Sequence, residues 1–159
     1  MGNAATPYNL SNNKGEITVQ NTANCYVISA PGFYCIPLVY GNAIKNGATN
    51  ASAYKSSAPV TNVTFGSPAA AKDVILHTLV DHDGKPITDP WIEKTKNKAY
   101  NGIDKAEVVW ADEANLVTLS TASIYRDGNG NAFVKFEVKK EDIKSGNAVL
   151  AVKKGNTTL

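Results

Sequence analysis

Two histidines are the residues best suited to chemistry in this chain of 159 residues. His77 and His82 lie five positions apart, and Asp81 and Asp83 flank the second histidine. Imidazole and carboxylate groups together can hold a metal ion or transfer protons. Residues five apart in a strand face opposite sides of a sheet, however, so one surface does not hold both histidines. We therefore expect no metal site here, and the run Asp81–Gly84 is typical of a turn.

A second pattern with a possible metal function begins at Asp127. Asp127, Asn129 and Asn131 match the first three ligand positions of a calcium loop. The match then fails, because Ala132 stands where that loop needs glycine and Val138 where it needs a bidentate glutamate. A hairpin turn is the better interpretation of this segment.

Motifs for covalent catalysis or phosphate binding are missing from the sequence. It contains no Gly-x-Ser-x-Gly elbow and no glycine-rich phosphate loop. Its carboxylates are scattered, apart from the pairs Asp112–Glu113 and Glu141–Asp142, whose neighbours place them in turns. A glycosidase would need two carboxylates to converge in one cleft. We expect no catalytic residues, no cofactor and no enzymatic activity.

Aromatic side chains in two irregular stretches are the candidates for a binding surface. Trp91 and Tyr100 lie within 81–102, and Tyr54 lies within the Asn- and Ser-rich stretch 41–59. Exposed rings of this kind can form a platform for sugars or peptides. The alternative is that the three rings only hold their own loops in place.

The two cysteines leave two alternatives open. Cys25 and Cys35 flank a predicted turn at Ala30–Gly32 and lie among apolar residues. A hairpin centred on Ala30 places the cysteines opposite each other, whereas a shift by one residue places them on opposite faces. A disulfide and two free buried thiols are both consistent with the spacing. Trp110 ends an apolar run and is predicted to belong to the core.

Composition and charge exclude several classes of function. Hydrophobic residues make up 43% of the chain and charged residues 19%, which is typical of a globular domain. The formal net charge is only +2, and Arg126 is the single arginine. We therefore expect no nucleic acid as partner, because such binding needs a strong positive field and favours arginine. No apolar run is long enough to span a membrane.

Strand-like segments recur about every ten residues, with Gly, Asn, Pro or Asp between them, as in a sandwich or barrel. The chain is predicted to be a single all-β domain over residues 1–159, with a flexible N-terminal segment at 1–13. An immunoglobulin-like or transthyretin-like β-sandwich of about eight or nine strands fits this spacing. The predicted strands span 16–20, 24–29, 33–40, 60–65, 73–80, 106–111, 116–125, 132–138 and 148–153. The strands at 24–29 and 33–40 should form one hairpin, and those at 116–125 and 132–138 another.

Seven short segments along the chain together resemble one protein family. They occupy Thr22–Ile28, Pro31–Tyr34, Pro37–Ile44, Leu79–His82, Ile87–Pro90, Val109–Trp110 and Gly146–Val152. This set resembles the fimbrillin-like surface proteins of Bacteroidota, over roughly residues 6–158. The resemblance implies an extracellular β-sandwich that functions in adhesion or fimbrial assembly. It also implies an outer-membrane surface location, as a lipoprotein domain within a longer exported protein, and it carries over no catalytic residues.

One departure from that family bears on the expected surface. In the family the segment after the strand at 148–152 continues into a tryptophan-rich strand, whereas this chain stops at Leu159. We therefore expect a sandwich that lacks its last strand and leaves an apolar groove beside an open edge. A strand from a protein partner, from a neighbouring subunit or from the rest of the same chain would fill it. The alternative function is a carbohydrate-binding module that binds a surface glycan through Trp91 and Tyr100.

Overall fold

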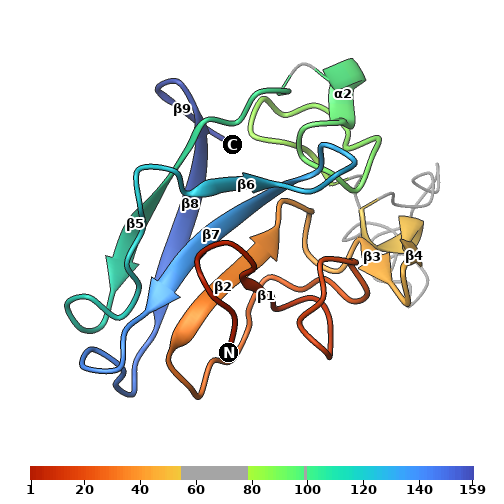
Figure 1. Cartoon of the computed structure of the whole chain (residues 1–159). Helices are drawn as coiled ribbons and strands as arrows, with labels where there is room; N and C mark the ends of the chain where they lie inside the picture. The colour runs from red at the N-terminus through yellow and green to blue at the C-terminus, as the bar shows by residue number, and fades with distance from the viewer. Residues whose placement is uncertain (55–78, 99) are drawn as a thin grey trace, which may run out of the picture.

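The computed structural model describes residues 1–54, 79–98 and 100–159. Nearly all the regular elements in these residues are strands, which confirms the prediction of an all-β sandwich. Two main sheets and one short hairpin account for the strands of this part of the chain (Figure 1). The hairpin pairs β3 (Ile44–Lys45) with β4 (Ala48–Thr49). Two short helical segments complete the elements, η1 (Ala51–Ala53) and α2 (Thr95–Lys98).

The first sheet has the strand order β1-β2-β7-β6. Its strands are β1 (Tyr8–Asn9), β2 (Gly32–Pro37), β6 (Ile124–Arg126) and β7 (Ala132–Val138). β1 runs parallel to β2, whereas β7 is antiparallel to both β2 and β6. β7 is buried along most of its length, as expected for a strand that is covered on both faces.

The second sheet has the order β5-β8-β9 and is antiparallel. Its strands are β5 (Lys105–Ala111), β8 (Ala148–Lys154) and β9 (Thr157–Thr158). A register shift between Val108 and Trp110 places two residues of β5 opposite one residue of β8, which is a β-bulge.

The core lies between these two sheets, as in other β-sandwiches. Val134 of β7 and Val152 of β8 belong to one buried cluster, and Leu150 of β8 packs against it. Tyr34 and Phe136, which are directly opposite each other on β2 and β7, form a second cluster with stacked rings. The alternate residues of these strands thus supply the inner face of the sandwich.

The N-terminal segment at 1–13 contributes β1 to the first sheet. Asn9 is fully buried, and its side-chain amide donates to the carbonyl oxygens of Ile17 and Thr18. Its Oδ1 atom accepts a hydrogen bond from the backbone N–H of Ser11. Short polar side chains here satisfy the backbone groups of their own loop, so burial of Asn9 costs little. Flexibility of 1–13 stays a prediction.

Four predicted strands are confirmed, at 33–40, 106–111, 132–138 and 148–153. The segments 16–20 and 24–29 form no strand, and 116–125 is a strand only at its end. The segment 60–65 and most of 73–80 lie outside the described residues.

The predicted hairpin of 24–29 with 33–40 is wrong, because β1 and β7 already occupy both edges of β2. The hairpin around Asp127 is confirmed. The N–H of Asp127 donates to Asn131 O at 3.1 Å, and the N–H of Gly130 donates to Asp127 O at 2.9 Å. β6 and β7 flank this turn.

Candidate functional site

The structure does not bring the three predicted binding aromatics together as an exposed platform. Tyr54 is 2% exposed and Tyr100 is 6% exposed, so both rings lie inside the protein. Only Trp91 of the three is partly exposed. Both tyrosines are core residues rather than parts of an exposed platform. Tyr54 packs with Ala43 and Ile87, and Tyr100 packs against the ring of His82.

Tyr100 anchors the turn at Asp81–Gly84. Its hydroxyl lies 2.9 Å from Oδ2 of Asp81 and 3.0 Å from Oδ2 of Asp83, and its ring contacts the ring of His82. Asp81 Oδ1 accepts the N–H of Asp83 and the N–H of Lys85, as expected of an aspartate that initiates a turn. His77 lies outside the described residues.

The loop at 41–59 is partly folded into the core, as far as the structure describes it. Ala43 and Ile44 are buried, and Ala43 forms a cluster with Tyr54 and Ile87. The tip of the β3–β4 hairpin remains exposed, and Gly47 there has a φ of 75°, which favours glycine. Residues 55–59 lie outside the described residues.

Both cysteines are free in the structure, so the disulfide alternative is not realised. Cys35 is buried on β2, whereas Cys25 is exposed. Burial raises the pKa of the Cys35 thiol to about 12, although the nearby Lys135 ammonium acts to lower it. The prediction that both thiols are buried is therefore wrong for Cys25, because the segment 24–29 does not pair as a strand.

Trp110 is an exposed residue and not part of the core. Its exposed fraction is 53%, and that of Val149, directly opposite on β8, is 48%. Val108 is paired with Leu150, which packs into the core, so the bulge that follows turns Trp110 to the outer face of the sheet. The sequence run alone does not reveal the bulge.

One candidate site is the open edge of β8. β9 pairs with Lys153 and Lys154, and the N–H of Leu159 donates to Val152 O at 3.0 Å. No other described strand pairs with this edge of β8, which leaves Ala148–Ala151 uncovered there. Backbone groups alternate between the two edges of an antiparallel strand. Lys153 O and Asn147 O accept hydrogen bonds from the β5 side, so the odd-numbered residues of this strand turn their backbone groups toward β5. The N–H and C=O groups of Ala148 and Leu150 therefore face the open edge.

An apolar groove of about 670 Å³ lies beside this edge. Both sheets contribute to it, with Ile36, Val134 and Phe136 on one side and Leu150 and Val152 on the other. An unpaired backbone edge next to such a groove is the arrangement by which proteins accept an added β-strand.

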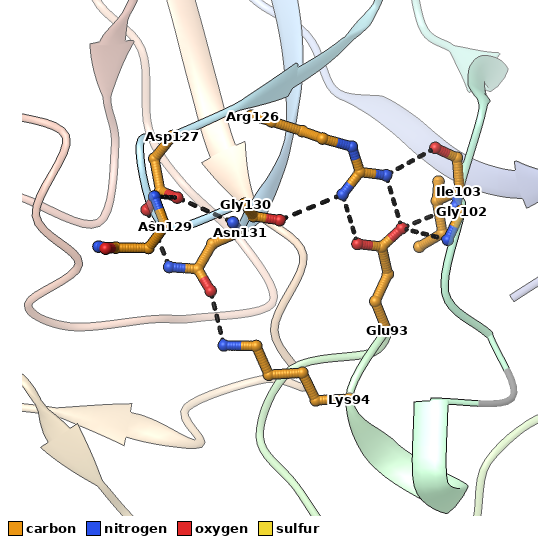
Figure 2. A network of polar contacts seen from close by, with 9 residues as sticks. All are labelled: Glu93, Lys94, Gly102, Ile103, Arg126, Asp127, Asn129, Gly130 and Asn131. Carbon is orange, nitrogen blue, oxygen red and sulfur yellow. Dashed lines mark hydrogen bonds and ion pairs between the residues drawn. The ribbon is translucent and has the colours of Figure 1, made fainter.

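A second candidate site is built around Glu93 and Arg126 (Figure 2). Arg126 Nη1 lies 2.6 Å from Glu93 Oε2, and Nη2 lies 2.8 Å from Oε1. Glu93 Oε1 also accepts the backbone N–H groups of Gly102 and Ile103. Burial acts to raise the pKa of Glu93, but these hydrogen bonds and the guanidinium charge outweigh it, so the pKa is lowered.

Lys94, next to Glu93, begins a chain of polar contacts that ends at Asp127 (Figure 2). Its Nζ atom donates to Asn131 Oδ1 at 2.7 Å and lies 5.2 Å from the centre of the Trp91 ring. Asn131 Nδ2 donates to Asp127 Oδ2 at 2.8 Å. Asp127 Oδ1 accepts the N–H groups of Asn129 and Asn131, so this carboxylate organises the whole turn.

Glu93, Lys94 and Asn131 of these residues line a small pocket of about 180 Å³. Its lining includes Trp91, Lys94, Lys98, Asn101 and Asn129. Trp91 is the one predicted site residue that belongs to it. The sequence offered one further signal that was missed: the only arginine of the chain immediately precedes the Asp127 turn.

Comparison of this chain with protein-family models, with curated proteins and with solved structures gave no significant match. Among the described residues, no helix has the length and apolar character needed to cross a membrane.

Proposed function

We propose that this chain is a non-enzymatic, extracellular adhesion or fimbrial assembly domain that accepts a β-strand from a neighbouring subunit along β8. The observation that carries the proposal is the open edge at Ala148–Ala151 beside the apolar groove. The resemblance of the sequence to fimbrillin-like proteins supports the surface location, as a lipoprotein domain within a longer exported protein. The exposed loops, such as the tip of the β3–β4 hairpin, supply further contact surface.

The geometry specifies how an added strand would bind. An antiparallel strand that continues the direction of β9 would pair its backbone with Ala148 and Leu150. Its alternate side chains would point into the groove, against Ile36 and Phe136. The backbone bonds would provide affinity, and the fit of the apolar side chains would provide specificity. Each large apolar side chain that is fully buried contributes about 1.5–3 kcal/mol.

The test uses a substitution that removes only the edge donor. In Ala148→Pro the N–H that faces the open edge is lost, whereas the bonds toward β5 are kept; Ala148→Ser keeps this N–H and is the matched control. Light scattering from micromolar to millimolar concentration should show association of the wild type and of Ala148→Ser, but a monomer for Ala148→Pro. Thermal melts should confirm that all three proteins are folded.

Backbone hydrogen exchange provides a second measurement on the same proteins. The amides of Ala148 and Leu150 should exchange fast in the monomer and slowly in the assembled state, because no strand of the described residues covers this edge and an added strand would. A wild type that stays monomeric at every concentration, with both amides already protected, would contradict the proposal.

A further inference from the structure

We propose that the pocket beside Trp91 binds a carboxylate-bearing sugar, such as a uronic acid or sialic acid residue of a surface glycan. This site goes beyond the strand-addition function and does not depend on it. The linings of the pocket and of the groove share one residue, Leu38.

The charge of the pocket favours an anion. Lys94 and Lys98 both line it, and among the described residues the only carboxylate in its lining is that of Glu93. The negative charge of Glu93 is already balanced by its bidentate ion pair with Arg126. An ammonium group has three donors, and Asn131 takes one from Lys94, so this lysine can also bind a ligand carboxylate.

Trp91 supplies an apolar surface of the kind that packs against a sugar ring. Its ring meets Phe133 edge to face, with the centroids 5.9 Å apart. The cation–π contact with Lys94 fixes the two side chains relative to each other. The pocket therefore presents an aromatic ring with a positive charge over it. The C–H groups of an acidic sugar can contact the part of the ring that Lys94 leaves uncovered, while its carboxylate pairs with the ammonium.

Three asparagines in the lining, at positions 101, 129 and 131, match the hydroxyl groups of a sugar. A side-chain amide offers both donors and acceptors, and a sugar hydroxyl can pair with either. An acidic protein side chain would engage the lysines but make no use of the amides of Asn101 and Asn129 or of the Trp91 ring. The observations thus favour a sugar over an acidic peptide.

The walls of the pocket are held in place by the protein itself. Arg126 donates to Ile103 O at 3.2 Å and to Gly130 O at 3.3 Å, which ties the loop before β5 to the turn after β6. Asp127 fixes the positions of Asn129 and Asn131. Such preorganisation lowers the entropy cost of binding. A volume of about 180 Å³ is smaller than a typical drug site and suits a single terminal sugar residue.

The experiment titrates the whole chain with five probes and follows the backbone and asparagine side-chain amides by NMR. The probes are glucuronic acid, N-acetylneuraminic acid, glucose, acetate and a short polyglutamate peptide. We expect one or both acidic sugars to shift the signals of Asn129 and Asn131 more strongly than glucose and acetate do.

The variants separate the pocket from general surface charge. Lys98→Gln and Lys94→Gln should each weaken binding of the acidic sugar about tenfold, since each removes a charged donor. Lys140→Gln removes an exposed lysine outside the pocket and should leave the affinity unchanged. Lys94 also contacts Asn131 and Trp91, so Lys94→Gln can reduce stability. If it does, the test depends on Lys98→Gln.

Three outcomes would overturn the inference. They are no response to either acidic sugar at millimolar concentration, an equal response to acetate and to the acidic sugars, and tighter binding of the peptide than of the sugars. Ala148→Pro should bind the sugar as the wild type does, so a failure of strand addition and a failure of sugar binding remain distinguishable.

Discussion

Arg126 and Glu93, which are 33 positions apart in the sequence, form a bidentate ion pair with N–O distances of 2.6 and 2.8 Å. The Glu93 side chain is only 8% exposed, whereas that of Arg126 is 37% exposed. The pair therefore joins a buried carboxylate on the segment before α2 to a guanidinium at the end of β6 (Figure 2).

Loss of Arg126 should destabilise the fold. In Arg126→Ala the Glu93 carboxylate stays buried without its counter-charge. We expect the free energy of unfolding to fall by about 2–3 kcal/mol, less than for a fully buried pair because the Arg126 side chain is 37% exposed and screened by solvent. Glu93→Gln should cost less, because the amide oxygen still accepts the N–H groups of Gly102 and Ile103. Urea denaturation of both single variants and of the double variant measures the coupling. A coupling energy near zero would show that the pair contributes nothing.

The same carboxylate predicts a loss of stability in acid. The pKa of Glu93 is lowered from its ordinary value of 4.5 in the folded protein. Its contribution is therefore complete above that value and disappears as the pH falls through the folded-state pKa. Melting temperatures from about pH 7 to about pH 2.5 should fall more steeply for the wild type than for Glu93→Gln, which carries no charge at this position. Parallel curves for the two proteins would refute this prediction.

The two thiols should differ in reactivity. Cys25 is exposed and should react at once with a thiol reagent in the native protein. Cys35 is buried with a pKa of about 12, so it carries almost no thiolate near pH 8 and should react only after unfolding. A count of one fast thiol in buffer and two in denaturant is expected, and Cys25→Ser should abolish the fast phase. A count of zero in denaturant without reductant would instead indicate a disulfide.

The two tryptophans should differ in their access to solvent. Trp110 is 53% exposed, whereas Trp91 is half-buried against Phe133. In Trp91→Phe the remaining Trp110 should emit at longer wavelength and be strongly quenched by acrylamide. In Trp110→Phe the remaining Trp91 should emit at shorter wavelength and be quenched less. Equal quenching in the two variants would contradict the outward orientation of Trp110.

Local features of the sequence determined the class of fold and some of its turns. Runs of β-branched and aromatic residues between turn residues predicted an all-β sandwich, and β7 and β8 lie where these runs are. The turn at Asp127 was predictable because its hydrogen bonds join residues no more than four positions apart. Such contacts depend mainly on residues that are close together in the sequence.

Only the tertiary structure decided which edges pair and which side chains are exposed. β2 has two edges, and β1 and β7 occupy both, so the segment 24–29 was left unpaired although its composition favours a strand. The bulge in β5 turned Trp110 outward, and contacts with the turn at Asp81–Gly84 hold Tyr100 in a buried position. Glu93 reaches Arg126 only when the two segments are folded together. These outcomes depend on competition between segments far apart in the chain for a limited number of edges and a limited buried volume, which local composition does not specify.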